Sequence, residues 1–305
     1  MRISDTIKAN LALLGAVTAW ASAFVAIRLG LAGYSPGSLA ALRFFIASMC
    51  LGTFFAANPR PAKLTLRNLG LTSLTGLFGI FAYSLLLNHG QTAMSPGVAS
   101  FIVAQTPVIT SVLAIVIFSE RPALITIVGI VISCLGVAII VAGQPMHVDS
   151  NFGLIMVALA TICGSIHTIC QKYLLKELMP YHVTTLSTWA GTLALVMFLP
   201  QLLTEAKDAP IDSTLAVIFL GIVPSTIGQW LWSYGLSKTT VVRAAAYLYT
   251  MPIISTVFGW LIFSEVPTRL ALTGGSIALI GAMLVKKDLT PHKAINDKAP
   301  KVTSA

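Results

Sequence analysis

Polar and charged residues along this chain fall into short clusters, and each cluster is followed by a long apolar stretch. Ten such stretches of about 18 to 25 residues can be counted, and each is long enough to cross the ~30 Å hydrocarbon core of a bilayer as a helix. They are too long, and alternate too poorly, for the strands of a membrane barrel. The pattern therefore predicts an all-α membrane protein with ten transmembrane helices. We place these helices at 9–30, 36–57, 68–88, 95–118, 123–142, 152–175, 180–203, 213–236, 241–263 and 268–285.

The composition agrees with this assignment and narrows the class of protein. Hydrophobic residues make up 56% of the chain and charged residues only 10%, and the mean hydropathy is +0.87, far outside the range of soluble proteins. The segments between the apolar stretches are too short for a soluble catalytic domain. A G-x-S-x-G pattern at 33–37 has proline after its serine, which removes the N–H group that an oxyanion hole requires. We expect a protein that is not an enzyme and that uses no cofactor or metal.

Lys and Arg residues are distributed unevenly between the two sides of the predicted bundle. Fifteen of the 19 fall on one side, two lie within helices, and only Lys207 and Arg269 fall on the other side. By the positive-inside rule the rich side is cytoplasmic, so we expect a protein of the cell inner membrane with both termini in the cytoplasm. The net charge of +9 follows from this asymmetry. We therefore expect the lipid bilayer, and no nucleic acid, as a partner.

The second part of the chain repeats the first. Shifting the sequence by 145 positions aligns 76–140 with 221–285 without a gap, and FSERP at 118–122 then meets FSEVP at 263–267. Each copy has five predicted helices, and an odd number forces the second copy to enter the membrane from the opposite side. The sequence thus predicts two inverted five-helix repeats. The predicted units are a first repeat at 1–143, a second repeat at 151–286 and a disordered cytoplasmic tail at 287–305.

Inverted repeats around a central site are typical of secondary transporters, although a duplication can also be kept for packing alone. Three stretches carry a more specific resemblance: AWASAFVAIRLGL at 19–31, SPGSLAALRFFIA at 35–47 and SPGVASFIVAQTPVITSVLAIVIFSERP at 95–122, the last with a counterpart at 240–267. Over 9–286 the chain resembles the ten-helix drug/metabolite transporters built from two EamA-type repeats. The resemblance implies export of a small metabolite, such as an amino acid or related amphipathic compound, by alternating access. The alternatives are a multidrug or nucleotide-like metabolite carrier, or a membrane scaffold or enzyme that transports nothing.

Polar and aromatic side chains at membrane depth are the candidates for substrate contact, because polar groups are costly in lipid and by default mark a pathway. Aromatic rings either line a cavity or face the lipid. All ten Asp and Glu residues fall in loops, tails or helix ends, so we expect an uncharged, zwitterionic or anionic substrate. The candidate substrate-binding residues are Trp20, Tyr83, Gln105, His167, Gln171, Gln229, Trp232, Tyr249 and Thr250.

Three further residues are expected to have structural or gating roles. Arg43 lies about 10 Å deep in its helix, at about 1.5 Å per residue, and needs either a helix-end carbonyl or the carboxylate of a bound substrate as a partner. Pro107 and Pro252 occupy matching positions in the two copies. Each bends its helix and frees the carbonyl group four residues earlier. Such a bend either serves packing or opens a carbonyl to a wet cavity.

His167 shares one helical face with Cys163 and Cys170, which raises a metal hypothesis. Three ligands on one helix fill only part of a tetrahedral shell, so packing and substrate contact are the alternatives. His167 is also the residue expected to carry protons if transport is proton-coupled, because the other histidine near membrane depth, His89, lies close to a helix end. Without such coupling the protein is a facilitator.

Small residues recur every four positions in the last predicted helix, at Gly274, Ala278 and Ala282. A face of this kind lets two helices approach closely, either between two copies of the chain or within one copy. A homodimer is therefore one of the two expected uses of this face, and the resemblance adds a small-molecule substrate as a partner.

Glu120 and Glu265 also match across the two copies. Each precedes a proline, Pro122 or Pro267, that begins the next predicted helix, so its carboxylate lies at the positive end of a helix dipole. The two residues either complement that dipole or gate the pathway.

Replacement of Glu120 or Glu265 by Gln distinguishes these roles. A carboxylate that complements a dipole contributes on the order of 1 kcal/mol to stability. Each variant should therefore lose a little thermal stability and keep its flux per folded molecule, measured in proteoliposomes. Loss of flux at normal stability would instead assign these residues to a gate.

Overall fold

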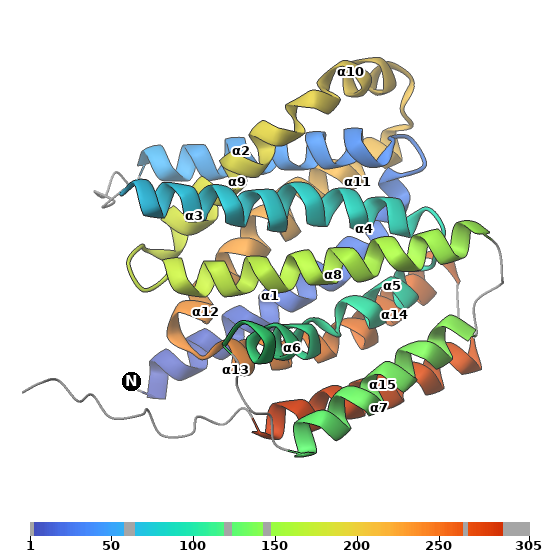
Figure 1. The fold of residues 1–305 in the computed structure, drawn as a ribbon. Coiled ribbons are helices and arrows are strands. Elements are labelled where there is room, and N and C mark those ends of the chain that lie inside the picture. Colours follow the sequence, from blue (N-terminus) through green and yellow to red (C-terminus); the bar gives the residue numbers. More distant parts are fainter. Residues whose placement is uncertain (1–2, 58–64, 119–123, 143–147, 265–267, 289–305) are drawn as a thin grey trace, which may run out of the picture.

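The structure is a computed structural model that describes residues 3–57, 65–118, 124–142, 148–264 and 268–288. All regular structure within these ranges is helical. Figure 1 shows most of the helices running side by side, with their axes close to one common direction. Seven helical stretches are long and apolar enough to cross a membrane, and three shorter apolar helices accompany them. The prediction of an all-helical membrane protein is confirmed at this level.

The helices follow one another along the whole described chain. In chain order the α-helices are α1 (Ile3–Gly30), α2 (Pro36–Ala57), α3 (Leu66–Gly76), α4 (Tyr83–Gln91), α5 (Pro96–Val103), α6 (Thr106–Phe118), α7 (Leu124–Ala142), α8 (Val148–Leu174), α9 (Pro180–Leu195), α10 (Leu199–Asp208), α11 (Ile211–Ile222), α12 (Gln229–Lys238), α13 (Val241–Ala245), α14 (Met251–Phe263) and α15 (Arg269–Asp288). Four short segments join some of them: the π-helical η1 (Leu77–Ala82) and η3 (Val223–Gly228), and the 3₁₀-helical η2 (Val196–Phe198) and η4 (Ala246–Thr250).

Prolines and short polar side chains set where several helices begin. Pro36, Pro96 and Pro180 each occupy the first position of a helix, where a missing N–H group costs nothing. Ser95 precedes α5, and its hydroxyl accepts a hydrogen bond from the Val98 amide at 3.4 Å. These three helices therefore begin within one residue of their predicted starts.

Two predicted helices are interrupted, and not merely bent, at their prolines. The sequence predicts one helix over 95–118, but α5 ends at Val103 and α6 begins at Thr106, with Pro107 at its second position. A proline ring clashes with the preceding turn of an α-helix, so a new helix starts there. The carbonyl of Val103 accepts a hydrogen bond from the hydroxyl of Thr106 at 2.6 Å. In the matching stretch Pro252 likewise lies in the first turn of α14, after the 3₁₀ turns of η4.

The hydrophobic pattern gives no sign of the two π-helical segments, η1 and η3. They lie at matching places in the aligned copies, between α3 and α4 and between α11 and α12. Pro224 in η3 has no N–H group to donate to the preceding turn, which explains the wider turn there. The hydroxyl of Thr226 donates to the carbonyl of Gly221 at 2.8 Å in compensation. No proline lies in η1, whose turns instead surround Gly79.

The two copies build one bundle by exchanging their first helices. In the second copy α11, η3, α12 and α14 pack against α1. The first helix of the second copy, α8, packs in the same way against α3, η1, α4 and α6 of the first. Figure 1 shows α8 between α3 and α4 on one side and α6 on the other. This exchange brings side chains from both copies together in the interior.

The helices α7 and α15 form a close pair at one edge of the bundle (Figure 1). A Cβ atom at Gly136 would lie 2.6 Å from the carbonyl oxygen of Gly274, and one at Gly281 would lie 2.6 Å from that of Gly129, so the two backbones are in direct contact. The contacts are reciprocal, because Gly129 and Gly136 align with Gly274 and Gly281 in the duplication. The small-residue face of α15 is thus used within the chain, and it offers no surface for the homodimer that was one of its two predicted uses.

Gly136→Ala should lower the stability of the whole protein. The added methyl group meets backbone atoms, which cannot swing away, and overpacking of this kind costs about 1–3 kcal/mol. Gly70→Ala is the matched control, because a Cβ atom there meets nothing within 4 Å, and it should be neutral or slightly stabilising. The midpoint of thermal unfolding in detergent, with gel filtration as the measure of folded protein, is compared between the two variants. Equal midpoints would show that α7 and α15 do not pack this closely.

Candidate functional site

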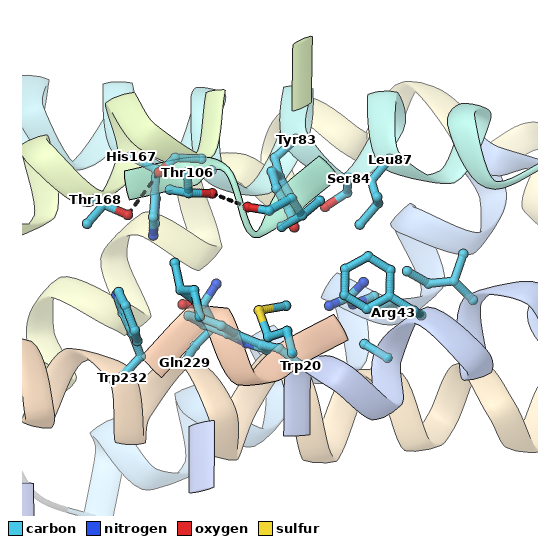
Figure 2. A pocket seen from close by; sticks show the side chains of 18 of the residues that line it. Trp20, Arg43, Tyr83, Ser84, Leu87, Thr106, His167, Thr168, Gln229 and Trp232 are labelled. Atoms are coloured by element: carbon cyan, nitrogen blue, oxygen red, sulfur yellow. Dashed lines mark hydrogen bonds between the residues drawn. The ribbon is translucent and has the colours of Figure 1, made fainter. Parts of the chain in front are cut away.

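A cavity of about 80 Å³ lies among helices of both copies. One water molecule needs roughly 10–15 Å³ of such space, so the cavity has room for several waters or a small solute. Side chains of α1, α2, α4, α8 and α12 form most of its wall, and Figure 2 shows them facing one open space. The polar lining residues are Arg43, Ser84, Thr106, His167, Thr168 and Gln229, and the aromatic ones are Trp20, Phe24, Phe44, Tyr83 and Trp232.

Five of the nine candidate binding residues lie in this wall. They are Trp20, Tyr83, His167, Gln229 and Trp232. Arg43, for which the sequence predicts a structural or gating role, lines the cavity as well. Residues far apart in the sequence and from both copies are therefore brought to one place.

Gln105 and Tyr249 instead face the α7 and α15 pair. Gln105 accepts a hydrogen bond from the hydroxyl of Ser133 in α7, and the hydroxyl of Tyr249 donates to the carbonyl of Ala282 in α15 at 2.9 Å. Both side chains fasten inner helices to this outer pair. Polarity at membrane depth shows that a partner is needed, but it does not show on which side of the helix the partner lies.

Gln171 and Thr250 also lie outside the cavity lining. Gln171 donates to the hydroxyl of Ser233 at 2.8 Å, and Ser233 shares a second hydrogen bond with Thr184 at 2.7 Å. These bonds connect α8, α12 and α9. The hydroxyl of Thr250 donates to the carbonyl of Tyr247 at 2.7 Å, within the turns that precede α14. All four displaced candidates therefore have structural contacts.

Arg43 lies in α2, is 6% exposed and has its guanidinium group in the cavity wall. Its Nε atom donates to the hydroxyl of Ser225 in η3 at 2.5 Å, and its Cζ atom lies 4.9 Å from the centre of the Phe44 ring. The sequence predicts a helix-end carbonyl or a substrate carboxylate as its partner, whereas the protein partner found is a hydroxyl. This bond uses one of the five N–H donors of the side chain. Within the described residues Nη1 and Nη2 make no hydrogen bond.

Trp20 in α1 is held by the π-helical segment η3. Its Nε1 atom donates to the carbonyl of Pro224 at 3.1 Å. Gly228 leaves room for the ring, since a Cβ atom there would lie 3.1 Å from the same nitrogen. The ring centre lies 5.0 Å from that of Trp232, with the planes inclined at 46°, an arrangement within the usual range of aromatic pairs. Figure 2 shows this aromatic wall beside Gln229.

His167 in α8 is held where α3 ends and the other π-helical segment, η1, begins. Its Nδ1 atom lies 3.0 Å from the carbonyl oxygen of Thr75, just before η1. Its ring packs on Gly79, where a Cβ atom would lie 2.7 Å from Cε1. A carbonyl oxygen can only accept a hydrogen bond, so Nδ1 carries the proton. In the neutral ring Nε2 is then a hydrogen-bond acceptor.

Three buried polar atoms in the cavity wall have no hydrogen-bond partner among the described residues. They are Ser84 Oγ, His167 Nε2 and Trp232 Nε1. Buried polar groups in proteins are nearly always paired, and an unpaired one costs about 1–3 kcal/mol. Because these three atoms line a cavity, a bound solute or water would have access to them as a partner.

His167 both packs against α3 and η1 and lines the cavity, so its predicted roles in packing and in substrate contact each have a matching contact, and its substrate and proton-carrying roles stay predictions. Cys163 and Cys170 are free thiols. In the part of the chain that the structure describes, no group of three or more His, Cys, Asp or Glu side chains could hold a metal ion. Glu120 and Glu265 lie outside the described residues, so their dipole or gating role stays a prediction.

Sequence reasoning missed the groups that hold the polar lining in place. These are the carbonyl of Thr75, the carbonyl of Pro224 and the hydroxyl of Ser225. One signal was present, because Pro224 falls inside an apolar stretch where a proline must disturb the helix. Thr75 had no comparable signal, because its backbone carbonyl makes the contact and a carbonyl is present at every residue.

The model of the EamA-like transporter family matches the chain twice, at 7–142 and at 151–286. A probable terminal-alkyne amino-acid exporter of Streptantibioticus cattleyicolor is 35% identical over 285 residues, which covers 92% of this chain and 94% of that protein. A probable amino-acid metabolite efflux pump of Salmonella typhimurium is 26% identical over 284 residues, which covers 89% of this chain and 92% of that protein.

A crystal structure of similar fold covers 93% of this chain and 96% of its own, with a TM-score of 0.60 and 17% sequence identity. At that identity the likeness concerns the fold alone. The family match spans nearly all of the described helices and confirms the resemblance first given by the three sequence stretches. The chain belongs to the EamA-like transporter family.

Proposed function

We propose that this transporter exports a small amphipathic metabolite, an amino acid or a related compound, across the cell inner membrane. The cavity carries the proposal, because it lies among helices of both copies and combines aromatic rings with a few polar groups. Three of its buried polar atoms lack partners within the described chain. A largely apolar cavity with a few directed polar groups suits a site for a small ligand.

The topology in this proposal has ten transmembrane helices in two inverted five-helix repeats. Seven long and three shorter apolar helices in the described ranges supply the spans. Two observations support inversion: the exchange of α1 and α8 between the copies, and the reciprocal glycine contacts of α7 and α15, which follow the pattern of an isologous dimer. Both termini are then cytoplasmic, in agreement with the distribution of Lys and Arg.

Alternating access follows from this arrangement. When inverted copies exchange their conformations, a central site that opens to one side of the membrane becomes open to the other. The substrate binds in the cavity, with its apolar part on the rings of Trp20 and Trp232 and its polar groups on the lining atoms that lack partners. In this mechanism the chain has no catalytic role.

The names of two relatives support the substrate class. One is called a probable terminal-alkyne amino-acid exporter, and the other a probable amino-acid metabolite efflux pump. The lining agrees with an amino acid, since it offers aromatic and aliphatic surface for a side chain and separate polar groups for the charged end. Within the described chain no Asp or Glu lines the cavity, which disfavours an organic cation as the substrate.

Filling the cavity should strongly reduce transport in a protein that still folds. Leucine at Gly164, where even a Cβ atom would lie 3.3 Å from the ring of Tyr83, or at Ala23 in α1, which also lines the cavity, occupies the space of the substrate. We expect either variant to lower flux by about tenfold or more, equivalent to roughly 1.4 kcal/mol of lost binding. Gly70→Leu is the control, because its position is open. Counterflow of labelled amino acids in proteoliposomes measures the flux, and gel filtration verifies the fold.

Two outcomes would contradict the proposal in different ways. Normal flux in both cavity variants would place the pathway elsewhere in the bundle. Failure of the unmodified protein to exchange any of the twenty amino acids would remove the amino-acid substrate class and leave the cavity to another solute.

A further inference from the structure

Arg43 and His167 lie at opposite ends of the cavity, and each presents an unused hydrogen-bonding group to it (Figure 2). They belong to different copies, one to α2 and the other to α8. Both are buried, with exposed fractions of 6% and 8%. Their groups are of opposite kind, because a guanidinium group can only donate hydrogen bonds whereas Nε2 of the neutral histidine accepts one.

The surroundings of Arg43 favour the binding of an anion at this end of the cavity. Ser225 accepts the hydrogen bond from Nε, and the ring of Phe44 packs against the guanidinium group. This orients the remaining pair, Nη1 and Nη2, which has the spacing for two parallel bonds to a carboxylate. A buried charge without a counter-ion is strongly unfavourable, and in the described part of the chain no Asp or Glu lines the cavity. We expect the substrate to supply the counter-ion.

At the other end of the cavity, the surroundings of His167 favour the binding of a hydrogen-bond donor. The carbonyl of Thr75 keeps the proton on Nδ1, and the close approach to Gly79 holds the ring in place. Nε2 is then left with its lone pair and with no partner among the described residues. An N–H or O–H group at the far end of a bound molecule would satisfy it.

We propose that the cavity selects an amino acid that has a free carboxylate and a side chain ending in an N–H or O–H donor. The carboxylate binds Nη1 and Nη2 of Arg43, and the side-chain donor binds Nε2 of His167. Ser84, whose Oγ atom also lacks a partner, lies across the cavity from Arg43 in Figure 2 and can accept from the amino group. This inference rests on the proposed function, in which the cavity is the transport site.

Selectivity at both ends comes from the cost of leaving a buried group unpaired. A ligand without a carboxylate leaves the guanidinium group with no counter-ion, and a ligand without the distal donor leaves Nε2 unpaired. Sites built around a polar group reject analogues that lack it far more strongly than an apolar pocket rejects a missing methyl group. Tyrosine should therefore be preferred to phenylalanine, although phenylalanine is the more apolar of the two.

Matched pairs of compounds test both ends on the unmodified full-length protein. The pairs for the histidine end are tyrosine with phenylalanine, tryptophan with 1-methyltryptophan, and glutamine with methionine. The pairs for the arginine end are tyrosine, tryptophan and glutamine with their carboxamides. Affinity is measured by competition against labelled amino acids in proteoliposome counterflow. In at least one of the pairs for the histidine end, we expect the compound with the side-chain donor to bind about tenfold tighter, or more, than its partner. In every pair for the arginine end in which the free acid binds, we expect the free acid to bind about tenfold tighter, or more, than its carboxamide.

Two variants assign each preference to its residue. In His167→Phe the preference for a distal donor should disappear while the preference for acid over amide remains. In Arg43→Gln the acid preference should disappear while the donor preference remains. A variant that is merely misfolded loses all binding together, so this crossed pattern identifies direct contact. Gly70→Ala should keep both preferences.

The outcomes that overturn the inference are separate from those that overturn the proposed function. The inference fails if both members of every pair bind with equal affinity. It also fails if a variant folds and keeps the preference assigned to the group that it lacks, because Arg43 and His167 then do not recognise the substrate as proposed. Because the pairs are compared first on the unmodified protein, the inference is decided even if a variant fails to fold. If none of the amino acids binds at all, the proposed amino-acid function itself fails.

Discussion

A polar group inside a bundle surrounded by lipid must find its partner within the protein, and this constraint decides how the cavity is built. In a regular helix each carbonyl accepts a hydrogen bond from a backbone N–H group and keeps a second lone pair that a side chain of a neighbouring helix can use. The carbonyl of Thr75, at the end of α3, accepts a hydrogen bond from His167, and the carbonyl of Pro224, in η3, accepts one from Trp20. These two carbonyls help to fix the orientation of the polar and aromatic lining.

Each of these anchors connects one copy of the duplication with the other. Thr75 belongs to the first copy and holds His167 of the second, whereas Pro224 belongs to the second and holds Trp20 of the first. Arg43 of the first copy is held by η3 in the same way. The wall of the cavity is therefore shared between the copies, and a movement of one copy against the other must change the anchors and the cavity together.

The spans and the duplication could be predicted from the sequence because length, apolar composition and the 145-residue register are properties of the chain itself. The orientation of side chains could not. In a bundle that faces lipid, both sides of a helix are apolar, so the pattern does not reveal whether Gln105 faces the cavity or α7. The π turn of η1 was also beyond prediction, since Leu77–Ala82 contains no proline. Pro224, by contrast, was a readable signal for η3.

The reciprocal contacts of α7 and α15 bear on how far the two copies can diverge. In a symmetric homodimer every substitution appears twice, so a charge placed near the axis would meet its own duplicate. Joining the copies in one chain removes that restriction. At an offset of 144 positions, which brings Pro36 onto Pro180, Arg43 aligns with Ser187. A single chain can thus bury one guanidinium group in its cavity where two identical subunits would have had to bury two.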